Sequence, residues 1–372
     1  MERKVIAVGT SLIVIITIAM CSLMMYFPNL HVAAVRLGDG WSIYTSENHS
    51  VMDPFKTDIV AQEDPLSHEA IDYLKGHDFR LELPINVTAS ALEITTEPTE
   101  RSISLSINGL SDTYLYEYPM YGNSTHIQDL TYYNEDKVGV ITMYLDNIFE
   151  IEMTRENEFM YFDLLEPHEV YDYIVCVDAG HGGNVPGATK LGVNEKDIDL
   201  QLVLALKDVF DRNDKNIGVY YTRIDDSNPS FESRVNMPND LKADVFISIH
   251  NNSTASGRMS SISGTEVMYR AADPTGESLR FSKMCLDHLV DDLGTKNKGT
   301  IVGDEIYIIR MTEMPVALIE LGFMTNKEEL ERLQDPLFQK KAAQSIYDAT
   351  VEYLMSKPDE TEVMRKESES DE

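Results

Sequence analysis

Two histidines and two glutamates lie close to apolar runs that are typical of buried strands. His181 follows the run "YIVCVDAG", His250 follows "DVFISI", and Glu320 follows "PVALI". Glu195 lies in the polar segment between the first of these runs and a helical pattern. Because functional groups of open α/β sheets collect at the carboxyl ends of the strands, these four side chains are expected to meet at one edge.

Two imidazoles and one carboxylate are typical ligands of a catalytic zinc ion, which keeps its fourth position for water. The sequence therefore predicts that His181, Glu195 and His250 hold Zn²⁺. A fourth carboxylate beside such a site is suited to proton transfer, and Glu320 is predicted to be this general acid/base. Gly180, Gly182 and Gly183 in the His181 loop are expected to let the backbone pass close to the metal without a side-chain clash.

Each of these residues also has a plainer explanation when it is taken alone. A histidine in a glycine-rich turn is often only solvated, and a histidine at a strand end can be a hydrogen-bonded core residue. Glu195 fits the first turn of a helix, where an acidic side chain interacts favourably with the helix dipole. Glu320 would equally fit a buried salt bridge to Arg310 or Arg234.

The elements that position these residues alternate between strand and helix after Tyr171. Apolar strand runs such as "IGVYYT", "GTEVMYR" and "EIYIIR" are separated by helical patterns at 197–210, 231–241 and 277–293, and helices follow from 326 to 354. This alternation predicts an α/β fold with a mostly parallel twisted sheet and helices on both faces. The preceding segment, 81–165, has short alternating runs separated by turn residues, which predicts an all-β sandwich or barrel.

Charge and the N-terminal pattern limit the partners of the chain. It has 31 Lys and Arg against 63 Asp and Glu, a formal net charge of -32, which argues against nucleic acid as a partner. Arg3 and Lys4 precede an uncharged run from 5 to 27, which is long enough to span a bilayer. We expect an uncleaved transmembrane signal anchor with its N-terminus inside, so that the rest of the chain is extracytoplasmic.

Several motifs, in order, resemble one enzyme family. The segments "VDAGHGG", "EKDIDL", "ADVFISIHNN", "GTEVMY" and "MPVALIELGFMTN" are similar to those of the zinc-dependent N-acetylmuramoyl-L-alanine amidases of type 3. The resemblance covers about residues 172–355. It implies His181, Glu195 and His250 as zinc ligands, Glu320 as general acid/base, and Arg310 as a substrate or transition-state contact.

The resemblance implies a hydrolase that acts on peptidoglycan at the bacterial cell surface, cleaving the amide between N-acetylmuramic acid and L-alanine. A zinc peptidase acting on stem peptides and a degenerate cell-wall binding protein remain alternatives, and an activator protein stays unknown. Segment 81–167 is similar in strand pattern to β-sandwich modules of the AMIN type, which bind cell wall. The predicted boundaries are 1–4 cytoplasmic stub, 5–27 transmembrane anchor, 28–80 irregular linker, 81–167 β-rich module, 168–357 catalytic domain and 358–372 disordered charged tail.

Overall fold

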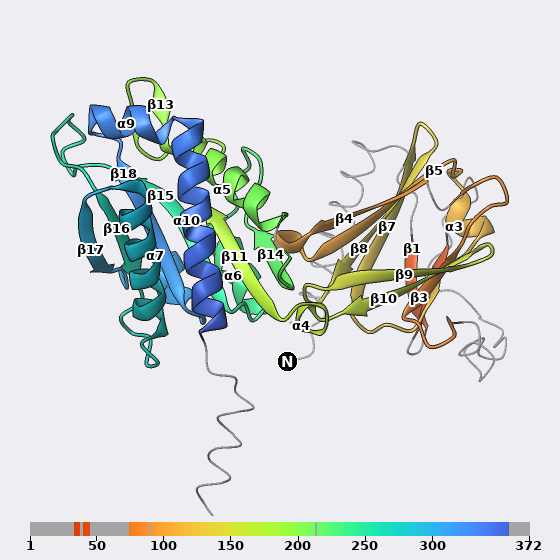
Figure 1. Cartoon of the computed structure of the whole chain (residues 1–372). Helices are drawn as coiled ribbons and strands as arrows, with labels where there is room; N and C mark the ends of the chain where they lie inside the picture. Colours follow the sequence, from red (N-terminus) through yellow and green to blue (C-terminus); the bar gives the residue numbers. More distant parts are fainter. Residues whose placement is uncertain (1–32, 38–39, 45–73, 89–90, 213, 357–372) are drawn as a thin grey trace, which may run out of the picture. The chain divides into compact units, whose positions relative to one another are not determined.

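The computed structural model in Figure 1 describes residues 33–37, 40–44, 74–88, 91–212 and 214–356. The chain forms two units with a boundary between Leu165 and Glu166. The predicted anchor at 5–27 and the predicted tail at 358–372 lie outside the described residues. Among the described helices, none has both the length and the apolar composition needed to cross a membrane.

The first unit is built from two antiparallel sheets. One sheet has the order β1 (Ala33–Leu37), β2 (Gly40–Tyr44), β6 (Tyr121–Gly122), β3 (Phe79–Glu82), β10 (Phe159–Leu165) and β9 (Glu150–Glu156). The other has the order β4 (Leu92–Glu97), β5 (Ser102–Asn108), β8 (Val138–Leu145) and β7 (Ile127–Glu135). Both sheets contribute buried side chains to one apolar cluster, Phe79 and Phe162 from the first, Leu105 and Ile141 from the second. The unit is therefore a β-sandwich, with the short helices η2 (Pro98–Glu100) and α3 (Tyr114–Glu117) in its connections.

The expectation of an irregular linker at 28–80 was wrong in part, because three strands of the sandwich begin in that range. β1 and β2 pair directly with each other, and β3 pairs with β10. These strands are only four or five residues long, which is too short for a period-two pattern to stand out from turn residues.

The second unit is centred on a six-stranded sheet. Its order is β14 (Ile217–Tyr221), β11 (Tyr173–Ala179), β15 (Val245–Asn252), β18 (Val316–Phe323), β16 (Thr265–Tyr269) and β17 (Asn297–Val302). Neighbouring strands are parallel except for β16, which runs antiparallel to β18, so the sheet is mixed. A small hairpin of β12 (Thr189–Lys190) and β13 (Val193–Asn194) follows the His181 loop, and α4 (Pro167–Val170) precedes β11.

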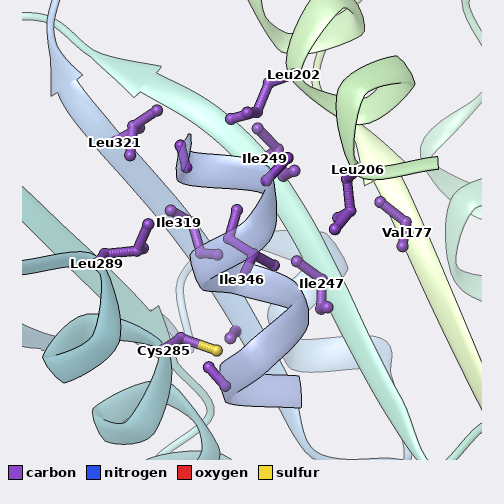
Figure 2. Packing of buried hydrophobic residues seen from close by; sticks show 14 of the residues in the cluster. Val177, Leu202, Leu206, Ile247, Ile249, Cys285, Leu289, Ile319, Leu321 and Ile346 are labelled. Carbon is purple, nitrogen blue, oxygen red and sulfur yellow. The ribbon is translucent and has the colours of Figure 1, made fainter. Parts of the chain in front are cut away.

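Helices cover both faces of this sheet, as predicted. α5 (Glu195–Phe210), α7 (Glu277–Leu293) and α10 (Pro336–Met355) lie on one face, where their apolar side chains pack on alternate strand residues such as Val177 and Ile247 (Figure 2). Asp178, which points to the opposite face, contacts α6 (Phe231–Asp240). α8 (Tyr307–Met311) packs beside α6, and α9 (Lys327–Leu333) follows β18. Each fully buried aliphatic side chain contributes about 1.5–3 kcal/mol to this packing.

One predicted strand was wrong. The run "EIYIIR" forms the short helix α8, and the edge strand β17 comes from the preceding, more polar segment 297–302. The backbone turns between them, where the Ile306 N–H donates to the Gly303 carbonyl at 2.8 Å. A short apolar run fits a buried helical turn as well as a strand, so its pattern could not separate the two.

Candidate metal centre

The loop after β11 carries His181 at the carboxyl edge of the sheet. The backbone of His181 has a φ of 59°, a left-handed conformation that costs a non-glycine residue about 1–3 kcal/mol. Two buried arginines bind the carbonyl oxygens of this loop. Arg223 donates to Ala179 and Gly180, and Arg234 donates to Ala179 and His181 itself. These hydrogen bonds hold the loop in the conformation that presents the His181 ring.

Asp178 fixes the second of these arginines. Its fully buried carboxylate accepts hydrogen bonds from Arg234 Nη1, Thr222 Oγ1 and Ser248 Oγ. Burial raises the pKa of Asp178, but the Arg234 charge and the two hydroxyl donors outweigh burial and lower that pKa below its ordinary value. The ionised carboxylate therefore neutralises one buried guanidinium directly beneath the His181 loop.

Glu195, the first residue of α5, joins the two predicted histidine ligands. Its Oε1 lies 3.0 Å from His181 Nε2 and 3.2 Å from His250 Nδ1, while its Oε2 accepts the Ala188 N–H at 2.7 Å. The two imidazole rings are 4.9 Å apart between centroids and nearly perpendicular. The backbone at Gly187 runs close to Glu195: a Cβ atom at this position would lie 2.5 Å from Glu195 Oε2, so any larger residue would clash.

The electrostatics of these three side chains favour a cation between them. Burial raises the pKa of Glu195, but hydrogen bonds from both histidines hold that pKa well below its usual range. Burial lowers the pKa of His250, whereas its hydrogen bond with Glu195 and the charges of Asp199 and Glu320 raise it to about 9. The site thus attracts positive charge, which a proton or a metal ion supplies.

His250 and Glu320 are neighbours on adjacent parallel strands, β15 and β18. The chain also approaches His250 closely from the side of β11: a Cβ on Gly180 would lie 2.3 Å from His250 Cε1. A side chain at position 180 would therefore clash with the His250 ring, one of the predicted metal ligands.

Glu320 has no salt-bridge partner among the described residues. Arg234 pairs with Asp178 instead, and the described hydrogen bonds of Arg310 are to the carbonyl oxygens of Asp304 and Glu305. Although Glu320 as a residue is half-buried, its Oε2 is shielded from solvent and has no hydrogen-bond partner in the described part of the chain. Burial raises the pKa of Glu320 to about 7, against the opposing charge of His250. Such a carboxyl group can both accept and donate a proton near neutral pH.

The structure adds one carboxylate that the sequence reasoning missed. Asp199 lies one turn after Glu195 on α5 and is fully buried, with Asn251 Nδ2 donating to its Oδ1 at 2.7 Å. Ligand atoms of His181, Glu195, Asp199 and His250 all lie within 4.8 Å of one another. The available signal was the i, i+4 spacing of Glu195 and Asp199 on one helix face.

These donors fit a divalent metal ion. Imidazole nitrogen and carboxylate oxygen are the ligand types that zinc accepts, and here they converge within a few ångströms. Glu320 lies beside this set, on the strand next to His250, with an oxygen that lacks a partner among the described residues. The cluster therefore offers three or four donor groups to a metal ion, and Glu320 lies beside it as a general acid/base.

Arg310 lies apart from these donors in its described contacts. It is exposed on α8, where its guanidinium lies 5.9 Å from the centre of the Tyr307 ring. Tyr307 in turn faces Phe231, with 6.1 Å between ring centroids. None of the described contacts of Arg310 is to His181, Glu195, His250 or Glu320.

The second unit is thus an α/β domain with a cluster of imidazole and carboxylate groups, suited to a metal ion, at the carboxyl edge of its sheet. Residues 175–352 match the family model described as N-acetylmuramoyl-L-alanine amidase. An uncharacterized Bacillus subtilis protein, YqiI, is 35% identical over 179 residues, which cover 48% of this chain and 84% of that protein. The chain belongs to this amidase family.

Two further comparisons concern proteins named as amidases. N-acetylmuramoyl-L-alanine amidase LytC of Bacillus subtilis is 31% identical over 179 residues, 48% of this chain. The chain spans only 35% of the length of LytC. A crystal structure of an N-acetylmuramoyl-L-alanine amidase from Clostridium difficile 630 has 30% identity and a TM-score of 0.47, covering 50% of this chain and 98% of that one.

Proposed function

We propose that this protein is a peptidoglycan hydrolase that cleaves the amide bond between N-acetylmuramic acid and L-alanine. The observation that carries the proposal is the position of Glu320: a carboxyl group with a pKa of about 7, beside a cluster of two histidines and a glutamate. The family supplies the bond to be cleaved, since LytC is named as an amidase of this type.

The residues of the site have separate tasks in this reaction. His181, Glu195 and His250 would hold a zinc ion, with Asp199 as a further carboxylate at hand. When bound, zinc would lower the pKa of water and polarise the amide carbonyl. Glu320 accepts the proton of the attacking water and then donates a proton to the departing L-alanine nitrogen, which makes the amine a better leaving group.

Arg310 is proposed as a substrate contact at the edge of the site. Its exposed guanidinium lies over the exposed ring of Tyr307, and that ring in turn faces the exposed ring of Phe231. Phe231 is three residues before Arg234, so both lie on one side of α6, and Arg234 binds the His181 carbonyl. An aromatic pair with a cation suits a substrate that combines a sugar ring with a carboxylate.

We further propose that the enzyme works outside the cytoplasm, held at the cell membrane by residues 5–27. The uncharged length of this segment and the basic residues before it support the proposal. A tethered amidase would reach peptidoglycan close to the membrane.

The test uses the full chain and purified peptidoglycan, with and without a chelator and with added zinc. Mass spectrometry of the released material should show intact stem peptides that begin with L-alanine, and the chelator should abolish their release. Fragments cut within the stem peptide would favour a peptidase instead. Release that persists without metal would contradict the proposed role of the cluster.

A further inference from the structure

Lys196, the second residue of α5, joins three segments that meet beside the metal centre. Its ammonium group donates to the Gly183 carbonyl oxygen at 2.9 Å and to the two carboxylate oxygens of Asp226 at 2.8 and 2.7 Å. Gly183 belongs to the loop that carries His181, and Asp226 belongs to the loop that follows β14. One side chain therefore connects the loop of the first predicted metal ligand to the helix that begins with the second, Glu195.

The backbone of the first turn of α5 is tied to the same loop. The Lys196 N–H donates to the Pro186 carbonyl at 3.1 Å, and the Glu195 N–H donates to the Ala188 carbonyl at 2.8 Å. These are N–H groups that a helix leaves without an intrahelical partner in its first turn. The His181 loop is thus fixed to α5 at its far end by backbone hydrogen bonds and nearer to His181 by the Lys196 side chain.

Asp226 also binds the Gly183 backbone directly. Its backbone carbonyl and its Oδ1 both accept the Gly183 N–H, at 2.9 and 3.0 Å. The two loops run so close together that a Cβ atom on Gly182 would lie 2.0 Å from the Ser227 carbonyl oxygen. The N–H and the carbonyl of Gly183 are therefore both engaged, and we call Lys196, Asp226 and Gly183 together the Lys196 clamp.

The Lys196 clamp differs from an ordinary surface ion pair. Only 13% of the Lys196 side chain is exposed, although Asp226 is 59% exposed, and one of its acceptors is a backbone carbonyl. Lys207, on the same helix, is 33% exposed, and the described hydrogen bonds of its ammonium group are to Asp211 alone. An exposed pair of the second kind contributes little to stability, whereas a shielded ammonium group that loses its acceptors is costly.

The Lys196 clamp completes the support of a strained residue. The His181 backbone has a φ of 59°, a conformation that persists only where surrounding contacts maintain it. Two arginines hold the carbonyls of residues 179–181, and the clamp holds the chain two residues after His181, at Gly183. His181 Nε2 and Glu195 Oε1, which lie 3.0 Å apart, come from the two segments that the clamp joins.

We propose that Lys196 is a positioning residue of the metal centre, which sets the geometry between His181 and Glu195 through its bonds to Gly183 and Asp226. Lys196 touches neither the metal nor the substrate in this role, because it acts through the His181 loop. Ligands that are held in place before the ion arrives bind it more tightly than ligands that must be ordered on binding. The inference rests on the proposed function for the presence of the metal ion, but not for the bond that is cleaved.

The test measures the affinity of the full chain for Zn²⁺ by competition with a chromogenic chelator. Lys196→Met removes the ammonium group but keeps an unbranched side chain, and it should bind zinc about 10–100-fold more weakly than the parent. Lys196→Arg keeps a cation that can donate to both acceptors, so it should recover most of the lost affinity. An arginine that recovers none of it would overturn the proposal, because the donor groups would then not be what matters.

Cobalt substitution reports the ligand geometry without a catalytic assay. Co²⁺ bound to the parent should give the visible absorption bands of a site with few ligands, whose position and intensity depend on the coordination geometry. Lys196→Met should shift or weaken these bands, because His181 and Glu195 are no longer held together. Bands identical to those of the parent would overturn the proposal.

A matched control and a milder variant complete the test. Lys207→Met removes an ammonium group that is paired with Asp211 on the same helix, and it should bind zinc and absorb like the parent. Asp226→Asn leaves the bond from Lys196 to Gly183 in place, and it should weaken zinc binding about threefold or more, which keeps the clamp testable if Lys196→Met does not fold.

Urea unfolding of the metal-free proteins separates positioning from stability. A clamp that only stabilises the fold would lower the free energy of unfolding of Lys196→Met while its zinc affinity stayed that of the parent. This result would overturn the proposal, as would parent-like zinc affinity in Asp226→Asn.

The outcomes also separate this inference from the proposed function. A parent chain whose zinc affinity depends on Lys196, but which releases no L-alanine-terminated peptide, would keep the positioning role while the amidase proposal fails. An active parent whose zinc affinity is unchanged in Lys196→Met and Asp226→Asn would remove the positioning role and leave the amidase proposal standing.

Discussion

Glu320 differs from Glu195 because none of the described hydrogen bonds joins it to His181 or His250, and its Oε2 has no hydrogen-bond partner among the described residues. Its replacement by Gln keeps the shape of the side chain but removes the proton transfer. We expect Glu320→Gln to bind zinc like the parent and to lose about 10²–10⁴-fold in amidase rate. Metal content by atomic emission and release of L-alanine-terminated peptides measure the two effects.

A neighbouring glutamate provides the control for this variant. Glu266 lies opposite Glu320 on β16 and accepts a hydrogen bond from Asn252 Nδ2. Glu266→Gln should keep most of the activity, because Glu266 takes no part in the proposed proton transfer. Retained amidase activity in Glu320→Gln would remove Glu320 from the mechanism.

Asp178 gives a stability prediction that depends on pH. Asp178→Asn leaves the Arg234 charge buried without its partner, which should lower the free energy of unfolding at pH 7 by about 3–5 kcal/mol. Because the pKa of Asp178 is lowered in the folded chain, its stabilisation is present above its unfolded pKa of about 3.9 and is lost as the pH falls through the lower, folded value. The difference between variant and parent should therefore shrink toward pH 3.

Urea unfolding of both proteins between pH 3 and pH 7 measures this difference. Asp240→Asn, at the C-terminal end of α6, controls for loss of an acidic side chain from the same region. A difference that stays constant over the whole range would mean that the Asp178 charge does not contribute to stability.

At the scale of the elements, the close approach of β11 and β15 sets the position of the His250 ring. Gly180→Ala places a Cβ atom 2.3 Å from that ring, so the ring or the loop must move. We expect zinc to bind about 10–100-fold more weakly. Loss of the residues that orient a metal ligand lowers metal affinity by this amount, and a displaced His250 ring should have a similar effect. Competition with a chromogenic chelator measures the affinity.

Gly322→Ala on β18 is the matched control for this change. A Cβ at that position meets Glu329 and Leu333 at 3.5 Å, an ordinary contact distance. Its zinc affinity should remain close to that of the parent. Equal affinities for the Gly180 and Gly322 variants would show that the His250 ring tolerates displacement.

The same elements show what the sequence could predict. Long apolar runs precede His181, His250 and Glu320, and these runs predicted the three strands β11, β15 and β18. The same pattern predicted that the three residues lie at the carboxyl edge of the sheet. Strand direction does not appear in such a pattern, so the antiparallel pairing of β16 with β18 could not be foreseen. β17 was missed because its sequence, "NKGTIV", is half polar and lies at the sheet edge.

The details of the site depend on contacts between distant segments, which no local pattern contains. Arg234 pairs with Asp178 rather than with Glu320 because α6 lies against β11, which carries Asp178. Asp199 was passed over because a carboxylate inside an amphipathic helix usually faces solvent. Its burial beside Asn251 depends on how α5 lies against the end of β15.

At the scale of the whole molecule, the two units have separate apolar cores. The cluster of the sandwich contains residues between Phe79 and Leu164, and that of the α/β unit contains residues between Val175 and Leu354, with none in common. Separate cores of this size are typical of domains that fold independently. The four residues that could hold a metal ion all belong to the α/β unit.

We therefore expect the full chain to unfold in two transitions, of which zinc moves only one. At a free zinc concentration of 100 times the Kd, the α/β unit should gain about 2.7 kcal/mol, while the sandwich transition stays in place. A fragment of residues 166–356 should show the same zinc-dependent shift as the full chain in differential scanning calorimetry. A single cooperative transition that zinc moves as a whole would contradict this, since it would require the two cores to unfold together.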